Sequence, residues 1–126
     1  DGTSLLQLDY AYDDAGNRTA VAEDGTAART SWTYDDQNQL LTDYRTGTNA
    51  YRQTFSYDPV GNRLSKTVDG TETTYAYDNA NQLKYGEVGG SRTTYVFDDN
   101  GNQQIEIPAA GNRTTTTWNY ENQPTV

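Results

Sequence analysis

The carboxylates are the residues of this chain whose type and spacing could do chemistry. Half of the 18 acidic residues stand in short recurring turn segments, most of which begin with Asp, such as Asp13-Asp14-Ala15-Gly16-Asn17. Paired carboxylates hydrolyse glycosides when an apolar pocket raises the pKa of one of them. Adjacent Asp residues in solvated turns lack such a pocket, and the same arrangement recurs in several turns. We therefore expect no enzyme activity.

A calcium site is the second chemistry that these acidic segments could support. Asp98-x-Asn100-x-Asn102 has the alternating oxygen ligands with which a calcium-binding loop begins. Gly101 is misplaced for such a loop, and no bidentate Glu follows at the right distance. Asp98, Asn100 and Asn102 are therefore weak metal candidates. We interpret the carboxylates as turn caps that accept hydrogen bonds from nearby backbone N–H groups, and no cofactor is expected.

The composition excludes further classes of function. The 126 residues include no Cys, no His and no Met, so the chain lacks a thiolate nucleophile, a disulfide framework and the commonest general base. A net charge of −9 argues against a nucleic-acid partner, which requires a basic face. No apolar run approaches the ~20 residues of a membrane helix. The apolar residues include 11 Tyr, 2 Trp and 2 Phe.

An aromatic-x-aromatic-acid unit recurs six times, with spacings of 22, 23, 20, 20 and 23 residues. A fixed period of this length is typical of a repeat architecture. The two aromatic residues of each unit stand at i and i+2, so they lie on one face of a strand, opposite a small and mostly polar face. This alternation predicts half-buried antiparallel strands. The six units are Tyr10–Asp13, Trp32–Asp35, Phe55–Asp58, Tyr75–Asp78, Tyr95–Asp98 and Trp118–Glu121.

Each repeat predicts two strands and two turns. The first turn begins with Asp, and its fourth position is always Gly or Asn, which tolerate a left-handed backbone. This pattern predicts a type I turn followed by a left-handed residue. The second turn fits a two-residue hairpin at Asp24-Gly25, Asp69-Gly70 and Gly89-Gly90, and longer connections elsewhere vary the period. The predicted left-handed residues are Gly16, Asn38, Gly61, Asn81 and Gly101.

Two kinds of first turn alternate along the chain. Gly-Asn-Arg or Gly-Asn-Gln occurs at 16–18, 61–63 and 101–103, whereas Asn-Gln-Leu or Asn-Gln-Pro occurs at 38–40, 81–83 and 122–124. The alternation indicates a structural unit of two hairpins, about 40–45 residues long. The sixth turn, interpreted as 120–124, is expected to be shortened by two residues. Because the chain lacks Met and begins with the turn-like Asp1-Gly2, we interpret it as a fragment cut inside a longer array.

The recurring Tyr-Asp-x-x-Gly-Asn-Arg motif resembles the YD repeat of RHS proteins, and is similar to repeats of bacterial ABC-toxin C components and animal teneurins. The resemblance implies an all-β fold in which tandem antiparallel hairpins form a continuous twisted sheet, a segment of a β-solenoid-like shell or fibre. One array is predicted over 1–126, with units 10–31, 32–54, 55–74, 75–94, 95–117 and a partial unit 118–126. The motif residues are Tyr12, Asp13, Gly16, Asn17, Tyr34, Asp35, Asn38, Tyr57, Asp58, Gly61, Asn62, Tyr77, Asp78, Asn81, Phe97, Asp98, Gly101, Asn102 and Tyr120.

The resemblance also implies a structural function. The segment is expected to be a wall panel of an RHS-type shell that encloses or presents a C-terminal effector, secreted by or displayed on a bacterium. Toxin-type members end their arrays in a self-cleaving region with paired Asp-Pro-x-Gly motifs. The single copy here, Asp58-Pro59-Val60-Gly61, is in register with the other turns and is interpreted as an ordinary turn.

The sequence is compatible with several partners and with one alternative function. The expected partners are neighbouring YD repeats of the same parent chain, further copies of the segment, an enclosed toxin domain or surface glycans. Neither nucleic acid nor membrane insertion is expected. The alternative function is an extracellular or cell-surface module, which would bind glycans through its aromatic face or assemble into fibres through its edge strands.

Overall fold

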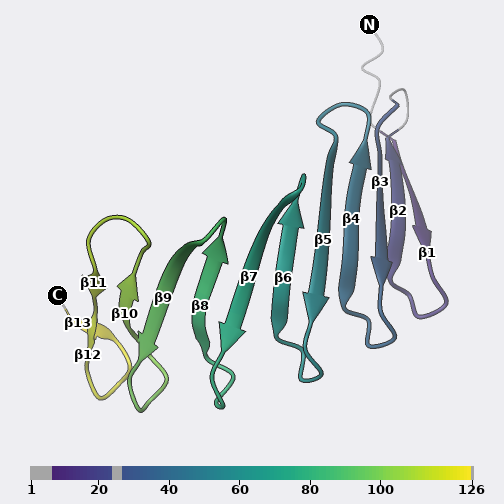
Figure 1. The fold of residues 1–126 in the computed structure, drawn as a ribbon. Helices are drawn as coiled ribbons and strands as arrows, with labels where there is room; N and C mark the ends of the chain where they lie inside the picture. Colours follow the sequence, from purple (N-terminus) through teal and green to yellow (C-terminus); the bar gives the residue numbers. More distant parts are fainter. Residues whose placement is uncertain (1–6, 24–26, 126) are drawn as a thin grey trace, which may run out of the picture. The chain divides into compact units, whose positions relative to one another are not determined.

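The computed structural model describes residues 7–23 and 27–125, which form strands joined by turns and loops (Figure 1). Two compact units are distinguished, the first containing residues up to 56 together with 66–70, and the second containing residues 57–65 and those from 71 onward. The described residues include no helix of the length and apolar character needed to cross a membrane. Within each unit, strands that follow one another in the chain lie next to each other in the sheet.

The first unit is built from successive antiparallel hairpins. Each strand pairs with the next one in the chain, and the register shifts by a bulge next to the first turn, between Ala11 and Tyr12 and between Thr33 and Tyr34. The left-handed residue of the turn causes such a bulge. The strands are β1 (Leu8–Tyr12), β2 (Arg18–Glu23), β3 (Arg29–Tyr34), β4 (Leu40–Thr46) and β5 (Tyr51–Tyr57), with Tyr57 assigned to the second unit.

The second unit repeats the same construction. Its strands pair antiparallel in chain order, again with a bulge beside the first turn, between Ala76 and Tyr77. The all-β fold of sequential antiparallel hairpins predicted from the repeat is therefore confirmed. The strands are β6 (Arg63–Val68, divided between the units), β7 (Thr71–Tyr77), β8 (Leu83–Val88), β9 (Ser91–Phe97), β10 (Gln103–Ile107) and β11 (Thr114–Thr115), with a separate pair of β12 (Thr117–Trp118) and β13 (Pro124–Thr125).

The backbone of the turns agrees with the sequence prediction. All five predicted left-handed residues have positive φ, namely Gly16 (85°), Asn38 (61°), Gly61 (93°), Asn81 (60°) and Gly101 (83°). The two-residue turns Asp69-Gly70 and Gly89-Gly90 have positive φ at both residues, as a type I′ hairpin requires. The other predicted turn of this kind, Asp24-Gly25, and the turn-like Asp1-Gly2 lie outside the described residues.

The sixth turn differs from the prediction. It begins at Asn119, whose side-chain oxygen accepts hydrogen bonds from the backbone N–H of Glu121 (2.9 Å) and Gln123 (3.0 Å). Asn122 takes the left-handed backbone (φ 57°), so the turn has full length. Trp118 therefore stands where Tyr120 was expected, and Tyr120 is 91% exposed within the turn. The prediction was wrong because Asn replaces the leading Asp and Tyr120-Glu121 imitates the Tyr-Asp pair.

Little of the chain is buried. Among the described residues the buried hydrophobic ones are Ala20 and Ala28, and no large side chain is fully buried. The predicted polar face opposite the aromatic residues is also apolar in part, because Val96 pairs with Ile105 on the face of β9 that Tyr95 does not occupy. Val96 lies on the first strand of this hairpin, β9, and Ile105 lies on the second, β10. The described sheet is therefore stabilised mainly by its ladder and turns.

Candidate functional site

The acidic residue that leads each first turn is held by the backbone of that turn. We number the turn positions 1 to 5, from Asp58 to Asn62 in the third turn. Asp58 Oδ1 accepts hydrogen bonds from the N–H groups of Val60 (3.0 Å) and Asn62 (2.8 Å). The Asn62 carbonyl accepts from the N–H of Asp58, and the Asp58 carbonyl accepts from the N–H of Gly61. Asp35, Asp78 and Asp98 cap their turns in the same way.

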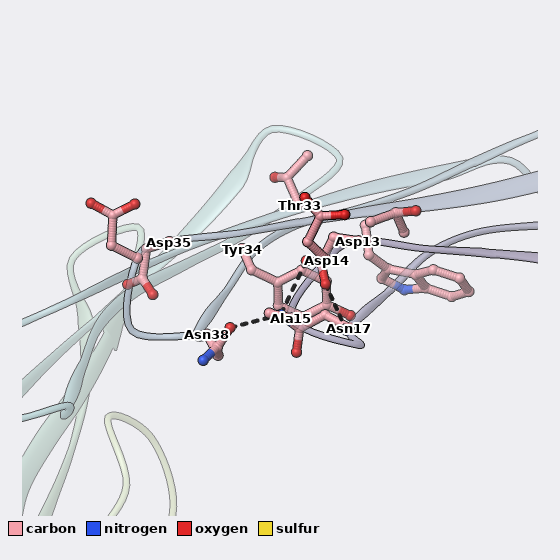
Figure 2. Close-up of a pocket in the computed structure, with 11 residues that line it drawn as sticks. Asp13, Asp14, Ala15, Asn17, Thr33, Tyr34, Asp35 and Asn38 are labelled. Atoms are coloured by element: carbon pink, nitrogen blue, oxygen red, sulfur yellow. Dashed lines mark hydrogen bonds between the residues drawn. The ribbon is translucent and has the colours of Figure 1, made fainter.

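Alternate turns have Asn at position 5, and its amide reaches the next turn. Asn17 Nδ2 donates to Asp13 Oδ2 (3.1 Å) in its own turn and to Asn38 Oδ1 (2.7 Å) in the following one (Figure 2). Asn62 donates likewise to Asp58 and Asn81, and Asn102 to Asp98 and Asn122. We call 13–17, 58–62 and 98–102 the donor turns, and 35–39, 78–82 and 119–123 the acceptor turns.

A second hydrogen bond joins each donor turn to the acceptor turn that follows it. The aromatic residue that precedes the acceptor turn donates from its side chain to the backbone carbonyl just after the donor turn. The three bonds are Tyr34 Oη to Arg18 O (2.9 Å), Tyr77 Oη to Arg63 O (3.1 Å) and Trp118 Nε1 to Gln103 O (2.9 Å). The equivalent role of Trp118 supports the corrected alignment of the sixth repeat.

A cation covers an aromatic ring in two of these three pairs. The guanidinium carbon of Arg18 lies 4.8 Å from the ring centroid of Trp32 and 5.3 Å from that of Tyr10. Arg63 lies 4.6 Å from the ring centroid of Tyr75, within the range of a cation–π interaction. In the third pair Gln103 replaces the Arg and Thr116 replaces the ring. The cation and the ring are therefore present together or absent together.

The donor turns lower the pKa of their leading carboxyl groups. Desolvation raises the pKa of Asp13 and Asp58, but hydrogen bonds from Asn17 and Asn62 outweigh it, and the pKa of each lies below its ordinary value. At Asp98 the backbone hydrogen bond from Asn102 is the largest cause of the lowered pKa. A glycosidase acid requires the opposite shift. The geometry of these turns therefore does not support the acid–base chemistry of paired carboxylates.

The weak metal candidates lie together in the fifth turn, in an arrangement that suits N–H donors. Asp98 Oδ1 faces the N–H groups of Asn100 and Asn102, and Asp98 Oδ2 faces the Asn102 amide at 3.1 Å. A cation at Asp98 would have to displace these donors. Within 7–23 and 27–125 no group of three or more His, Cys, Asp or Glu residues is arranged to hold a metal ion.

A hollow of about 520 Å³ lies beside the first donor and acceptor turns (Figure 2). Trp32 and Tyr34 line it together with Asp13, Asp35 and residues of both turns. Asp13 and Asp35 use carboxylate oxygens in the hydrogen bonds of their own turns, and the Tyr34 hydroxyl is bonded to a backbone carbonyl. The walls of the hollow thus belong to the turn network.

The fold and the repeated turn network define an all-β protein of sequential antiparallel hairpins. No protein-family profile matches the chain. The tRNA nuclease WapA of Bacillus subtilis (strain 168) and the tRNA3(Ser)-specific nuclease WapA of Bacillus spizizenii are each 36% identical to it over 76 residues. The match covers 60% of this chain and 3% of each relative, so the chain spans a small part of their length.

Two solved structures have a similar fold. A TcdB2–TccC3–Cdc42 crystal structure matches with a TM-score of 0.78 and 17% identity, covering 98% of this chain and 7% of that one. A Photorhabdus luminescens Tc holotoxin pore with a mutation in TccC3 matches with a TM-score of 0.71 and 20% identity, covering 89% of this chain and 7% of that one. With the WapA matches, these findings confirm the predicted resemblance to the RHS/YD-repeat family.

Proposed function

We propose that this chain is a structural scaffold, a wall segment of an RHS-type shell that encloses or presents a C-terminal effector. The observation that carries the proposal is the antiparallel hairpin sheet with its repeated turn network, which matches the TcdB2–TccC3 structure along 98% of the chain. The proposal treats residues 1–126 as one array of YD repeats within a longer parent protein. The parent is proposed to be secreted or held at the bacterial surface.

The chemistry of the described residues supports a wall rather than a catalyst. The carboxylates that could act as acids or bases are engaged as turn caps, with lowered pKa values in the donor turns. The WapA relatives are named as tRNA nucleases, and the chain covers 3% of their length. In the proposed parent, any such activity belongs to a domain outside these residues, and the present residues shield or display it.

The proposal is tested on the full-length parent protein. Electron microscopy should show a hollow shell, and a protease should spare the domain that follows the repeats while the shell is intact. Deletion of residues 7–125 removes all the hairpins described above, so it should open the wall and expose that domain. A parent whose C-terminal domain is cleaved equally with and without the deletion would contradict the enclosing role.

The alternative is an adhesive or fibre-forming surface module that uses aromatic rings such as those of β1. Tyr10 is 44% exposed and Tyr12 is 63% exposed, and their ring centroids are 6.5 Å apart. Such rings could stack against sugars. Filaments instead of closed shells in the same micrographs would favour this alternative, as would glycan binding that is lost in Tyr12→Ala but retained in Tyr120→Ala.

A further inference from the structure

We propose that neighbouring hairpins recognise each other through a matching rule, in which position 5 of one turn selects position 4 of the next. The partner that this surface fits is a YD hairpin of the complementary turn type. The rule concerns the interface between repeats and applies equally to a shell wall or a fibre. Its failure would therefore leave the proposed function untouched.

The junction from a donor turn to an acceptor turn uses Asn at both positions. The amide nitrogen of Asn102 has two hydrogens, which are donated to Asp98 Oδ2 (3.1 Å) and Asn122 Oδ1 (2.8 Å). The accepting residue also stands at positive φ, with 57° at Asn122. Asn and Asp are the non-glycine residues that tolerate this backbone and also have a side-chain oxygen that accepts a hydrogen bond. Gly at the same place would keep the turn but remove the acceptor.

The junction from an acceptor turn to the next donor turn uses a different match. Position 5 is Gln82, whose side chain is one methylene longer than that of Asn and reaches Gly101 at position 4 of the following turn. A Cβ atom placed on Gly101 would lie 3.4 Å from Gln82 Nε2. The Gln82 amide is therefore the group nearest to such a Cβ atom, at ordinary van der Waals contact distance. An Asn side chain at this place would have to displace that amide.

The two matches explain why the turn types alternate. Asn is followed by Asn, and Gln is followed by Gly, so each turn type accepts only the other type as its successor. A single added hairpin breaks this order, because it places Gln before Asn or Asn before Gly. Hairpins added in pairs preserve it. The rule therefore predicts that arrays of this kind lengthen and shorten by two hairpins at a time.

A compensating pair of substitutions in the 126-residue chain tests the match between Gln82 and Gly101. Gln82→Asn leaves the space above Gly101 empty, and Gly101→Asn crowds Gln82. Each single substitution should therefore raise the equilibrium constant for unfolding several-fold. The double variant recreates the donor–acceptor pair of the other junctions. It should return to within about twofold of the parent, a coupling typical of residues in contact.

A control with the same residue types distinguishes matching from general effects. Gly89 has positive φ and no atom within 4 Å of a built Cβ, so Gly89→Asn combined with Gln82→Asn should give additive losses. Additive losses for Gln82→Asn and Gly101→Asn as well would overturn the rule. Some variants will unfold too readily for denaturant titration. For these, the hydrogen-exchange rate of the Gly101 N–H, which donates to the Asp98 carbonyl, measures the same coupling within the turn.

Insertions test the pairing order independently. A second copy of residues 78–97, inserted after residue 97, adds one hairpin step and places Gln82 before another acceptor turn. A second copy of 58–97 at the same point adds two steps and keeps the order. The single-step insertion should unfold at lower urea concentration than the two-step one. The single-step insertion with Asn81→Gly in the inserted copy has the same length and a restored match, so it should regain stability. Equal stability of the two single-step insertions would also overturn the rule.

Discussion

Removing one phenolic hydroxyl should measure the bond that ties a donor turn to its acceptor turn. The Tyr77 hydroxyl donates to the Arg63 carbonyl at 3.1 Å in a partly buried site. Tyr77→Phe retains the ring and its packing, so the change removes one hydrogen bond and leaves the carbonyl without that donor. A neutral hydrogen bond contributes about 0.5–1.5 kcal/mol net. Because water can reach this half-buried carbonyl in part, we expect a loss of about 1 kcal/mol.

Urea unfolding of the 126-residue chain, followed by tyrosine and tryptophan fluorescence, gives the required comparison. Tyr120→Phe is the matched control, because the Tyr120 ring is 91% exposed in the sixth turn. It should change the free energy of unfolding by less than about 0.5 kcal/mol, as is usual for exposed sites. Tyr34→Phe should also destabilise the chain, but by less, because Tyr34 makes the equivalent bond to Arg18 in an exposed site. Indistinguishable midpoints for Tyr77→Phe and Tyr120→Phe would refute the assigned role of the hydroxyl.

Three further predictions concern the glycines, the acid response and the cation–ring pairs. Gly16→Ala should cost about 1–2 kcal/mol of stability, because alanine is strained in a left-handed conformation. Gly47→Ala should cost more, because its Cβ would also lie 2.8 Å from Ala27 O and Ala28 Cα. Equal decreases in melting temperature for the two variants would contradict this. The lowered pKa values of Asp13, Asp58 and Asp98 contribute stability that is complete above the ordinary value of 3.8 and is lost as the pH falls through the lower folded values. Replacing the three Asp residues by Asn should therefore reduce the loss of stability that occurs as the pH is lowered. A variant that loses as much stability at low pH as the parent would count against the turn caps. Arg63→Gln should cost about 0.5–1 kcal/mol more when Tyr75 is present than in a Tyr75→Thr background, and a double-mutant cycle that shows no coupling would refute the interaction.

The backbone of the turns was predictable because its cause is local. Gly and Asn tolerate a left-handed conformation more readily than most residues. The positive φ angles of Gly16 and Asn38 could therefore be predicted without reference to any neighbouring strand. The same reasoning missed Asn122, because its turn begins with Asn119 in place of the usual Asp. A leading Asn can accept the same backbone hydrogen bonds through its oxygen. A turn motif defined by Asp or Asn, with Gly or Asn three residues later, would have found the sixth turn.

The contacts between turns were not predictable in detail, because they depend on strand register. Asn17 and Asn38 are 21 residues apart, and they meet only after the bulges next to the two turns have set the pairing of β1, β2 and β3. The alternation of Gly-Asn with Asn-Gln did indicate a two-hairpin period. It did not identify a donor and an acceptor, nor the Tyr34 bond that accompanies them.

The scarcity of buried side chains determines how such a chain should lose its structure. With Ala20 and Ala28 as the buried hydrophobic residues of the described chain, no common core links distant hairpins. The caps act within one turn, and the amide and aromatic bonds act between neighbouring turns. Stability is then close to a sum of repeat and nearest-neighbour contributions. Loss of one junction, for example between Asn62 and Asn81, removes no contact at another, and hydrogen exchange should therefore increase most in the turns next to that junction.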